Sequence, residues 1–397
     1  MTADSRRPGG EGDRGGRAAA VLVAHPGAEL YGSDRVMLET VLGLRAVGRR
    51  VVVTVPVDGP LLVDLTAAGA EVVPVRTAVV RKSALRPAGF VRFAADAAVG
   101  AVRGWALLRR VRPDVVYVST VTVPLWALLA RLARRPVLWH VHEAEGSQPA
   151  LVQRLLAAPL ALATRVVANS HYSVDVLARS APRAAARATV VLNAVPGPAE
   201  PTPARAALEG PLRLLYIGRL SQRKGVDVAL EALGELRAGG DDVVLDLLGA
   251  VYPGYEWFEQ QLRDRAAELG VTDAVRFLGF HPSIWPFLEE ADAVVVPSVV
   301  DEPFGNTAVE AVLAARPLVV SATSGLLEAA AGYASAQQVP PGDVGALADA
   351  VRTVGKEWEQ RRQDAMADAA VARERHAPEQ YRRRLVEAVD AVVRRRA

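Results

Sequence analysis

The chain has 397 residues, more than one ordinary hydrophobic core holds, so two domains are expected. Hydrophobic residues make up 51% and charged residues 23%, which is typical of a globular protein, and the absence of cysteine excludes disulfides and thiolate metal sites. The 47 basic and 44 acidic residues nearly balance, so no nucleic acid partner is expected.

Residues 1–17 carry charges but lack the apolar segment of a signal peptide, so they are predicted to form a disordered tail of a cytoplasmic protein. Residues 10–15, GEGDRG, match the pattern G-x-G-x-x-G. A dinucleotide-binding turn must follow a strand and open a helix. Because this segment precedes the first predicted strand, we expect no dinucleotide to bind there.

Valine-rich runs and helical patterns alternate from residue 18 onward. In the first half, strands are predicted over residues 19–25, 49–57, 70–75, 113–120, 135–142, 164–170 and 188–193. In the second half, strands are predicted over residues 212–219, 243–249, 274–280, 291–298 and 316–322. Nearly unbroken apolar runs of this kind are typical of parallel strands that are buried on both faces.

These elements predict an α/β fold of two Rossmann-like, doubly wound domains that face each other across a cleft. The first domain covers residues 18–195 and the second covers residues 211–377. Residues 196–210 contain four prolines and form the predicted linker. Residues 378–397 are predicted to form an amphipathic helix that packs back on the first domain.

Residues 86–113, RPAGFVRFAADAAVGAVRGWALLRRVRP, form an arginine-bearing amphipathic stretch. The stretch allows two interpretations: it lies on an anionic bilayer at the inner face of a membrane, or it covers the first sheet with its arginines in water. Other long apolar stretches are interrupted by arginines well before the roughly 18 residues that a membrane span needs. Peripheral contact with a membrane therefore stays an open alternative.

A first cluster of candidate site residues follows the first strand of the second domain. Ligands of doubly wound sheets bind beyond the carboxyl ends of the strands. Arg219 follows the apolar run LRLLYIG, residues 212–218, and Lys224 stands just before a helical pattern. Two cations and the free amides of a helix start can hold a diphosphate. The alternative is an ordinary basic loop that caps a helix.

A second cluster lies in residues 299–312, VVDEPFGNTAVEAV. Glu302 is placed in a loop, and Glu310 is placed on a helix that begins near Gly305 or Asn306. The amides at this helix start would meet an anion, while Glu310 could accept hydrogen bonds from sugar hydroxyls. The alternative is that Glu310 is a solvated helix residue.

Taken together, three segments resemble a known family. GRLSQRKGVDVALEAL, VRFLGFHPSIWPFLEEADAVVVPS and DEPFGNTAVEAVLAARPLVV resemble, in order and spacing, the donor domain of family 4 retaining glycosyltransferases of the GT-B fold. The resemblance is strong over residues 212–330 and weaker over 18–195. It implies a hexosyltransferase that moves a sugar, with retention of configuration, from a nucleotide-diphosphate sugar to a hydroxyl of a glycan, a lipid-linked or a small-molecule acceptor.

The resemblance also implies roles for single residues. Arg219 and Lys224 would neutralise the diphosphate, Glu310 would bind the ribose, and Glu302 would lie beside the transferred sugar. Further donor contacts are implied for Gly32, Ser33, Phe304, Gly305, Asn306 and Thr307. The first domain's Gly-rich loop reads Tyr31-Gly32-Ser33 where the family often has two glycines, which puts a close backbone approach in doubt.

Two histidines stand at the end of predicted strand 135–142. His140 and His142 are two residues apart and share a face. A metal pair and a hydrogen-bonded strand end are both open interpretations. In the family, a histidine at this strand end contacts the donor sugar and helps to organise the reaction centre. By this resemblance His142 is the expected catalytic residue, together with Glu302, Arg219 and Lys224, and His140 is the fallback.

Two departures from the family and one missing motif bear on the donor site. The family's frequent Asn-Gly appears here as Asn193-Ala194, and an acidic-glycine turn is replaced by residues 250–258, AVYPGYEWF. No two aspartates are two residues apart, so the Asp-x-Asp metal site of the other large glycosyltransferase fold is missing. No metal or other cofactor is expected, and fixed cations would stabilise the leaving diphosphate instead.

Three other functions remain as alternatives. A sugar-nucleotide epimerase shares the double Rossmann plan but would show more carboxylates and histidines in the first domain. A pyridoxal-dependent phosphorylase would need a buried lysine in the second domain, where Lys224 already stands in the phosphate loop. A non-catalytic accessory protein would have little reason to keep Arg219, Lys224, Glu302 and Glu310 together.

Overall fold

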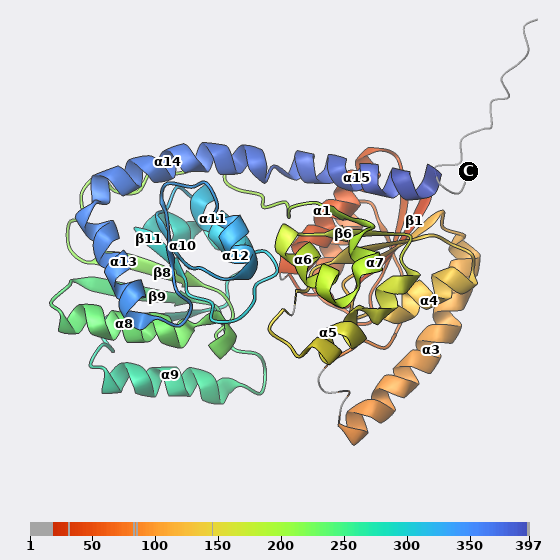
Figure 1. Ribbon diagram of the computed structural model, residues 1–397, viewed down its shortest axis with the longest axis horizontal. Helices are drawn as coiled ribbons and strands as arrows, with labels where there is room; N and C mark the ends of the chain where they lie inside the picture. The colour runs from red at the N-terminus through yellow and green to blue at the C-terminus, as the bar shows by residue number, and fades with distance from the viewer. Residues whose placement is uncertain (1–18, 31, 82–83, 85, 145, 395–397) are drawn as a thin grey trace, which may run out of the picture.

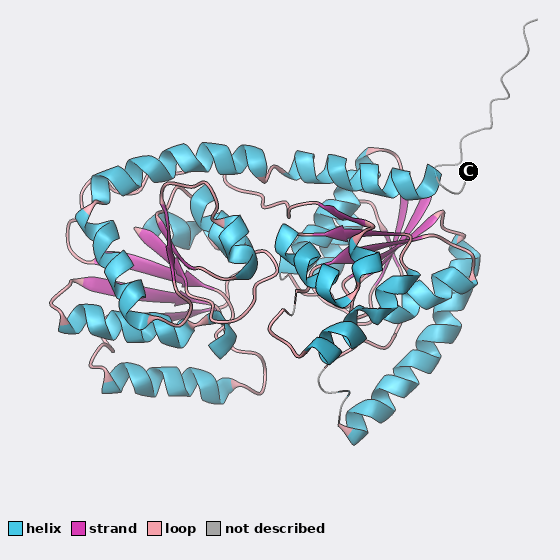
Figure 2. Cartoon of the chain, in the orientation of Figure 1, coloured by secondary structure: helices cyan, strands magenta, loops and turns pink. Residues whose placement is uncertain are grey.

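The computed structural model describes residues 19–394, apart from residues 31, 82, 83, 85 and 145 (Figure 1). The predicted disordered tail, residues 1–17, lies outside the described residues. Two parallel sheets lie next to each other along the long axis of the molecule (Figure 2). The predicted α/β fold with two facing Rossmann-like sheets is confirmed.

The first sheet has the strand order β3-β2-β1-β4-β5-β6-β7, and all neighbouring strands are parallel. Its strands are β1 (Ala20–Ala24), β2 (Arg50–Thr54), β3 (Glu71–Val72), β4 (Val115–Ser119), β5 (Val137–Val141), β6 (Arg165–Ala168) and β7 (Ala188–Val190). Successive side chains of a strand enter opposite faces of the sheet. Val21 and Val23 therefore join one core, while Leu22 and Ala24 join the other.

Helices cover both faces of the first sheet. They are α1 (Gly32–Ala46), α2 (Leu61–Ala67), α3 (Pro87–Val111), α4 (Pro124–Leu132), α5 (Ala150–Ala157), the 3₁₀ segment η2 (Ala158–Leu162), α6 (His171–Ser180) and α7 (Pro182–Ala185). Side chains of α1 and α2 join the core on one face, and side chains of α3 and α4 join the core on the other.

The second sheet has the strand order β10-β9-β8-β11-β12-β13 and is also parallel throughout. Its strands are β8 (Leu212–Ile217), β9 (Val243–Leu248), β10 (Val275–Gly279), β11 (Ala293–Val296), β12 (Leu318–Ser321) and β13 (Ala336–Val339). The covering elements are the 3₁₀ turn η3 (Gln222–Lys224), α8 (Val226–Ala238), α9 (Glu256–Glu268), α10 (Trp285–Glu290), α11 (Asn306–Leu313), α12 (Ser324–Ala329) and α13 (Val344–Lys356).

Two strands differ from the sequence prediction. β13 was not predicted, because its sequence AQQV contains two glutamines and lies at the sheet edge. Predicted strand 70–75 is reduced to the two residues of β3. The backbone beyond β3 still donates hydrogen bonds to β2, but Pro74 has no N–H and limits the ladder.

The chain passes between the two sheets twice. The first passage, residues 191–211, contains no helix or strand and includes the predicted linker. The second passage joins α14 (Trp358–Arg375), which packs on α11, to α15 (Pro378–Arg394), which packs on α1. The two passages touch where the Val195 N–H donates to the His376 carbonyl at 3.2 Å. In Figure 1, α14 and α15 run end to end along the upper edge of both domains.

Helix α3 packs on the first sheet with its second half alone. Its buried residues are Gly100, Gly104, Leu107, Leu108 and Val111. None of residues 87–99 is buried, and this half of the helix projects from the body of the molecule (Figure 1). The interpretation in which this stretch covers the sheet therefore holds for half of the helix. In the described part of the chain, no helix is long and apolar enough to cross a membrane.

Candidate active site

A cleft of about 580 Å³ lies between the two domains, at the carboxyl ends of the parallel strands. It is lined by every residue that the sequence predicted to be catalytic or to bind the donor: Gly32, Ser33, His142, Arg219, Lys224, Glu302, Phe304, Gly305, Asn306, Thr307 and Glu310. The fold thus brings together residues that are up to 278 positions apart in the chain, from Gly32 to Glu310.

Lys224 and Glu302 form an ion pair in this cleft. The Lys224 Nζ lies 2.6 Å from Glu302 Oε1, and the Ser298 hydroxyl donates to the same oxygen at 3.0 Å. Gly225 follows Lys224 with φ of +64°, and a Cβ there would lie 1.9 Å from the Pro297 carbonyl oxygen. Only glycine fits this close approach, which fixes Lys224 against the loop that carries Glu302.

Arg219 lies on the loop after β8, with its guanidinium over the ring of Tyr252 at 3.4 Å from the ring centroid. The Tyr216 hydroxyl donates to the Arg219 carbonyl at 2.8 Å. Tyr252 belongs to the segment 250–258 that departs from the family pattern. An aromatic face under a guanidinium attracts the cation and restricts its movement. The departure thus gives Arg219 a support that the sequence pattern did not indicate.

Glu310 lies on α11, and the prediction that this helix begins at Gly305 or Asn306 is confirmed. The Glu310 side chain is 12% exposed and lies 4.0 Å from an Arg35 guanidinium nitrogen. Burial raises the pKa of Glu310 to about 7, while the charges of Arg35 and Lys224 act to lower it. Near neutral pH this carboxyl can therefore take either protonation state.

Gly305, just before α11, cannot be replaced without a shift. Its φ is +111°, and a Cβ there would lie 2.5 Å from Leu326 Cδ2. The amides of Asn306 and Thr307 open the helix toward the cleft, where a helix start favours an anion.

Arg35 is a site residue that the sequence analysis missed. It lies in the first turn of α1, and its side chain reaches across the cleft to the second domain. One guanidinium nitrogen donates to the Pro282 carbonyl at 3.0 Å, while Nε donates to the Leu30 carbonyl at 3.2 Å. Arg35 stands two residues after Ser33 in the Gly-rich loop, so the loop itself was the signal that could have found it.

The two histidines differ in their surroundings. His142 lines the cleft, whereas His140 is fully buried and its Nδ1 is hydrogen-bonded to the Tyr117 hydroxyl. Burial, followed by the nearby His25, lowers the pKa of His142 to about 3, so its imidazole is neutral at physiological pH. The centroids of the His140 and His142 rings lie 3.9 Å apart. No group of three or more metal-ligating side chains occurs within the described residues, so the metal-pair interpretation finds no third ligand.

Asn193 and Asn306 also join the two walls. The Asn193 side-chain amide donates to the Asn306 side-chain oxygen at 2.9 Å. A Cβ at Gly32 would lie 3.2 Å from Asn306 Nδ2, so the backbone of the Gly-rich loop does approach the second domain closely. Tyr31 lies outside the described residues. The Asn193-Ala194 departure thus places its asparagine at the cleft, hydrogen-bonded to the loop that carries the anion-facing amides.

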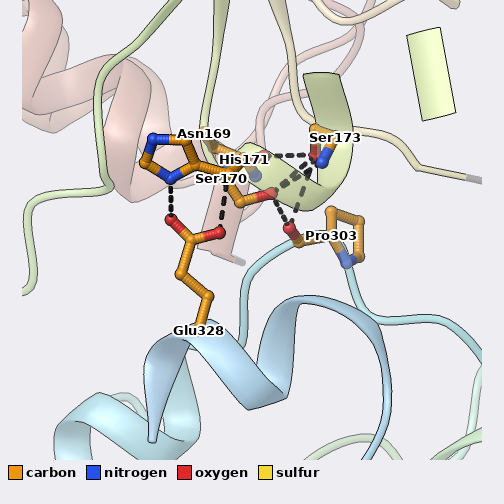
Figure 3. A network of polar contacts seen from close by, with 6 residues as sticks. All are labelled: Asn169, Ser170, His171, Ser173, Pro303 and Glu328. Atoms are coloured by element: carbon orange, nitrogen blue, oxygen red, sulfur yellow. Dashed lines mark hydrogen bonds and ion pairs between the residues drawn. The ribbon is translucent and has the colours of Figure 1, made fainter. Parts of the chain in front are cut away.

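A further contact between the domains lies at the start of α6 (Figure 3). The Ser170 hydroxyl donates to the Pro303 carbonyl, next to Glu302. The Glu328 carboxylate accepts from the main-chain N–H of His171 at 2.8 Å and lies 2.7 Å from its Nδ1. A carboxylate at a helix N-terminus is favourably placed. The Ser170 bond holds the Glu302 loop against the first domain, and the Glu328 contacts hold α12 against it.

Two family models match the chain, one on each side of the cleft. Residues 31–196 match the model described as Glycosyltransferase Family 4, and residues 202–370 match the model described as Glycosyl transferases group 1. The chain belongs to a glycosyltransferase family with the GT-B fold. The cleft of this GT-B chain lies between the two matched regions and is lined by the charged residues Arg35, Arg219, Lys224, Glu302 and Glu310.

Sequence relatives of the GT-B chain match it over part of their length. Glycogen synthase from Mycobacterium tuberculosis is 40% identical over 172 residues, which are 43% of this chain and 40% of that protein. D-inositol 3-phosphate glycosyltransferase from Corynebacterium urealyticum is 34% identical over 174 residues, 42% of this chain and 40% of that protein. The chain thus spans about two fifths of the length of these relatives.

A solved structure resembles the whole chain. HepE from Anabaena, in complex with UDP and glucose, superposes with a TM-score of 0.77 over 93% of this chain and 99% of that chain, at 19% identity. This likeness shows the fold. The epimerase alternative is not favoured, because the two sequence relatives are a synthase and a glycosyltransferase.

Proposed function

We propose that this GT-B chain is a retaining glycosyltransferase that moves a sugar from a nucleotide-diphosphate sugar to an acceptor hydroxyl. The observation that carries the proposal is the gathering of two cations and two carboxylates, Arg219, Lys224, Glu302 and Glu310, on one wall of one cleft. Such a wall suits a ligand with a central diphosphate and hydroxylated groups at both ends. HepE, a structural neighbour, was crystallised with UDP-glucose, which supports a donor of this class.

In this proposal the second domain binds the donor. Arg219 and Lys224 neutralise the diphosphate together with the amides at the start of α11, and they stabilise the charge that grows on the leaving group. Glu310 accepts hydrogen bonds from the ribose, and Glu302 accepts them from the transferred sugar. Because Lys224 pairs with Glu302 at 2.6 Å in the structure, the sugar and the diphosphate are expected to bind at adjoining positions.

The first domain contributes neutral groups to the reaction centre. His142 offers a neutral imidazole to the sugar hydroxyls, and the loop from Gly32 to Ser33 faces the diphosphate across the cleft. The sugar's bond to the diphosphate breaks while the acceptor oxygen bonds to the same face of the sugar, and a leaving phosphate oxygen takes the acceptor's proton. Configuration is thereby retained, with no metal required, and the acceptor is a glycan, a lipid-linked or a small molecule.

A ligand screen tests the proposal. UDP-, GDP-, ADP- and dTDP-sugars are each added to the purified protein, and the unfolding temperature is recorded, because a ligand that binds the folded state alone stabilises it. One base is expected to raise the temperature clearly, and that donor should be hydrolysed or transferred with retained configuration by NMR. No shift with any nucleotide sugar, together with no donor consumption, would contradict the proposal.

A further inference from the structure

Helix α3 presents an apolar face to solvent, on the side opposite to the sheet. With 100° per residue, its buried residues Gly100, Gly104, Leu107, Leu108 and Val111 lie on one side. From residue 91 to residue 106 the opposite side carries only apolar residues: Val91, Ala95, Ala98, Val102 and Ala106, all of them exposed. Val91 is 68% exposed and Val102 is 73% exposed.

This pattern is the reverse of that of a helix which only covers a core. Such a helix carries polar and charged residues on its outer side. Here Trp105 extends the apolar outer face, and Leu128 and Leu132 of the neighbouring α4 are exposed as well. α3 and α4 pack closely, since a Cβ at Gly104 would lie 2.8 Å from Leu129 Cδ1. Exposed apolar side chains therefore occur on both of these packed helices.

Cations flank this surface. Residues 86–135 contain nine arginines and two aspartates, a net charge of +7, whereas the whole chain has a net charge of +3. The remaining 347 residues therefore carry a net charge of −4. Arg92, Arg103 and Arg110 lie along one edge of the apolar face of α3, and all three are exposed. The charge that complements this surface is negative.

We propose that the outer face of α3, with the exposed leucines of α4, docks on an anionic lipid bilayer. The apolar side chains would enter the boundary between headgroups and acyl chains, while the arginines stay at the headgroups. A second copy of this chain is the less suited occupant, because two such faces would bring their arginines together. The proposal is independent of sugar transfer, and vesicle binding tests it without any substrate.

The test is co-sedimentation of the full chain with vesicles of equal parts phosphatidylglycerol and phosphatidylcholine, beside vesicles of phosphatidylcholine alone. Binding is expected on the anionic vesicles at low salt and should weaken at 1 M salt, where the Debye length falls to about 3 Å. The double variant Arg92→Glu/Arg103→Glu should lower the partition coefficient by at least about tenfold, since each basic residue near an anionic surface contributes about 1 kcal/mol. The double variant Val91→Ser/Val102→Ser should lower it as well.

Matched controls are available on other surfaces. Arg383→Glu/Arg384→Glu makes the same charge change on α15, which runs along the opposite side of the first domain (Figure 1), and should bind as the unaltered chain does. Tyr255→Ser/Trp257→Ser removes exposed aromatic residues of the second domain and should also leave binding unchanged.

Several results would overturn the proposal. These are no binding to anionic vesicles at low salt, equal binding to both kinds of vesicle, or equal losses in the α3 variants and their controls. A dimer in solution that Val91→Ser/Val102→Ser converts to monomer would instead assign the face to a second copy.

Discussion

The two walls of the cleft differ in charge. The wall from the second domain carries Arg219, Lys224, Glu302 and Glu310, all in loops or short helices that follow parallel strands. Among the described residues, the wall from the first domain carries neutral polar groups such as His142 and Asn193, together with the cation Arg35.

This difference indicates how the work is divided. A nucleotide sugar carries two negative charges at its centre, and fixed cations recognise them strongly. An acceptor hydroxyl is neutral, so a neutral wall suits it and avoids unpaired buried charge. Donor binding is therefore assigned to the second domain and acceptor approach to the first, with Arg35 as the link between them.

The largest expected effect comes from removing a cation of the second wall. Arg219→Ala and Lys224→Ala should each lower nucleoside diphosphate affinity by about tenfold to a hundredfold, because charge-assisted hydrogen bonds contribute roughly 1.5 to 3 kcal/mol. Transfer should slow further, since the leaving group gains charge. Arg223→Ala is the matched control, because Arg223 does not line the cleft and donates to the Asp301 carbonyl. Equal losses in all three variants, by calorimetry, would contradict the assignment.

The buried carboxyl of Glu310 should weaken the fold at high pH. Its pKa is about 7 when folded and 4.5 in the reference state, so between these values the folded chain binds more protons than the unfolded chain. Stability is therefore lost as the pH rises from about 4.5 to about 7. Glu310→Gln should raise the unfolding temperature by several degrees at about pH 8 and hardly at all at about pH 4.5.

The exposed Glu209 provides the control for this measurement. Glu209→Gln should leave the unfolding temperature unchanged at both pH values. A Glu310→Gln variant that is stabilised equally at the higher and the lower pH would show that ionisation of this carboxyl does not limit the fold.

The sequence predicted the second wall better than the first, for a physical reason. Arg219, Lys224, Glu302 and Glu310 belong to two short segments whose spacing alone places them after strands, and the predicted start of α11 is confirmed. Contacts between domains depend on how two separate sheets face each other, and local sequence patterns do not predict this placement. Arg35 therefore went unnoticed, as did the bond from Asn193 to Asn306.

The same limit applies to the edges and surfaces of the fold. The strand β13 has few apolar residues because an edge strand can keep glutamines half or fully exposed, so its pattern gave no signal. Amphipathic spacing in residues 86–113 was visible, but whether the apolar face met the sheet or solvent depended on tertiary packing. The structure shows both, on opposite sides of α3.

Removing Arg35, the cation on the wall from the first domain, should have a smaller effect on nucleoside diphosphate affinity. Arg35→Ala removes the contact with Glu310 and the bond to the Pro282 carbonyl, so nucleoside diphosphate affinity should fall by only about threefold to tenfold, as for a half-exposed charge. The proposed ribose contact uses the ionised carboxylate of Glu310, so nucleoside diphosphate affinity should fall as the pH drops through the pKa of Glu310. Because Arg35 lowers this pKa, the loss of Arg35 should move that fall in affinity to higher pH. Arg45→Ala, at the far end of α1, is the control. If the pH dependence of nucleoside diphosphate affinity is unchanged in Arg35→Ala, Arg35 does not influence Glu310 across the cleft.

No effect is expected from removing divalent metals. Fixed cations stabilise the leaving diphosphate in this account, so donor binding and turnover should persist in excess chelator. Loss of both with chelator, and recovery on adding Mg²⁺ or Mn²⁺, would show that the second wall is incomplete without a metal.

Calorimetric titration of the alanine variants of Glu302 and Glu310 with the nucleoside diphosphate separates the proposed roles of the two carboxylates. Glu310→Ala should weaken binding, because its proposed partner is the ribose. Glu302→Ala should leave affinity unchanged or raise it by a few fold, since Lys224 loses its partner at 2.6 Å and is free for the phosphate, while turnover of the full donor falls. If Glu302→Ala loses diphosphate affinity as severely as Arg219→Ala, the proposed assignment of the two carboxylates is wrong.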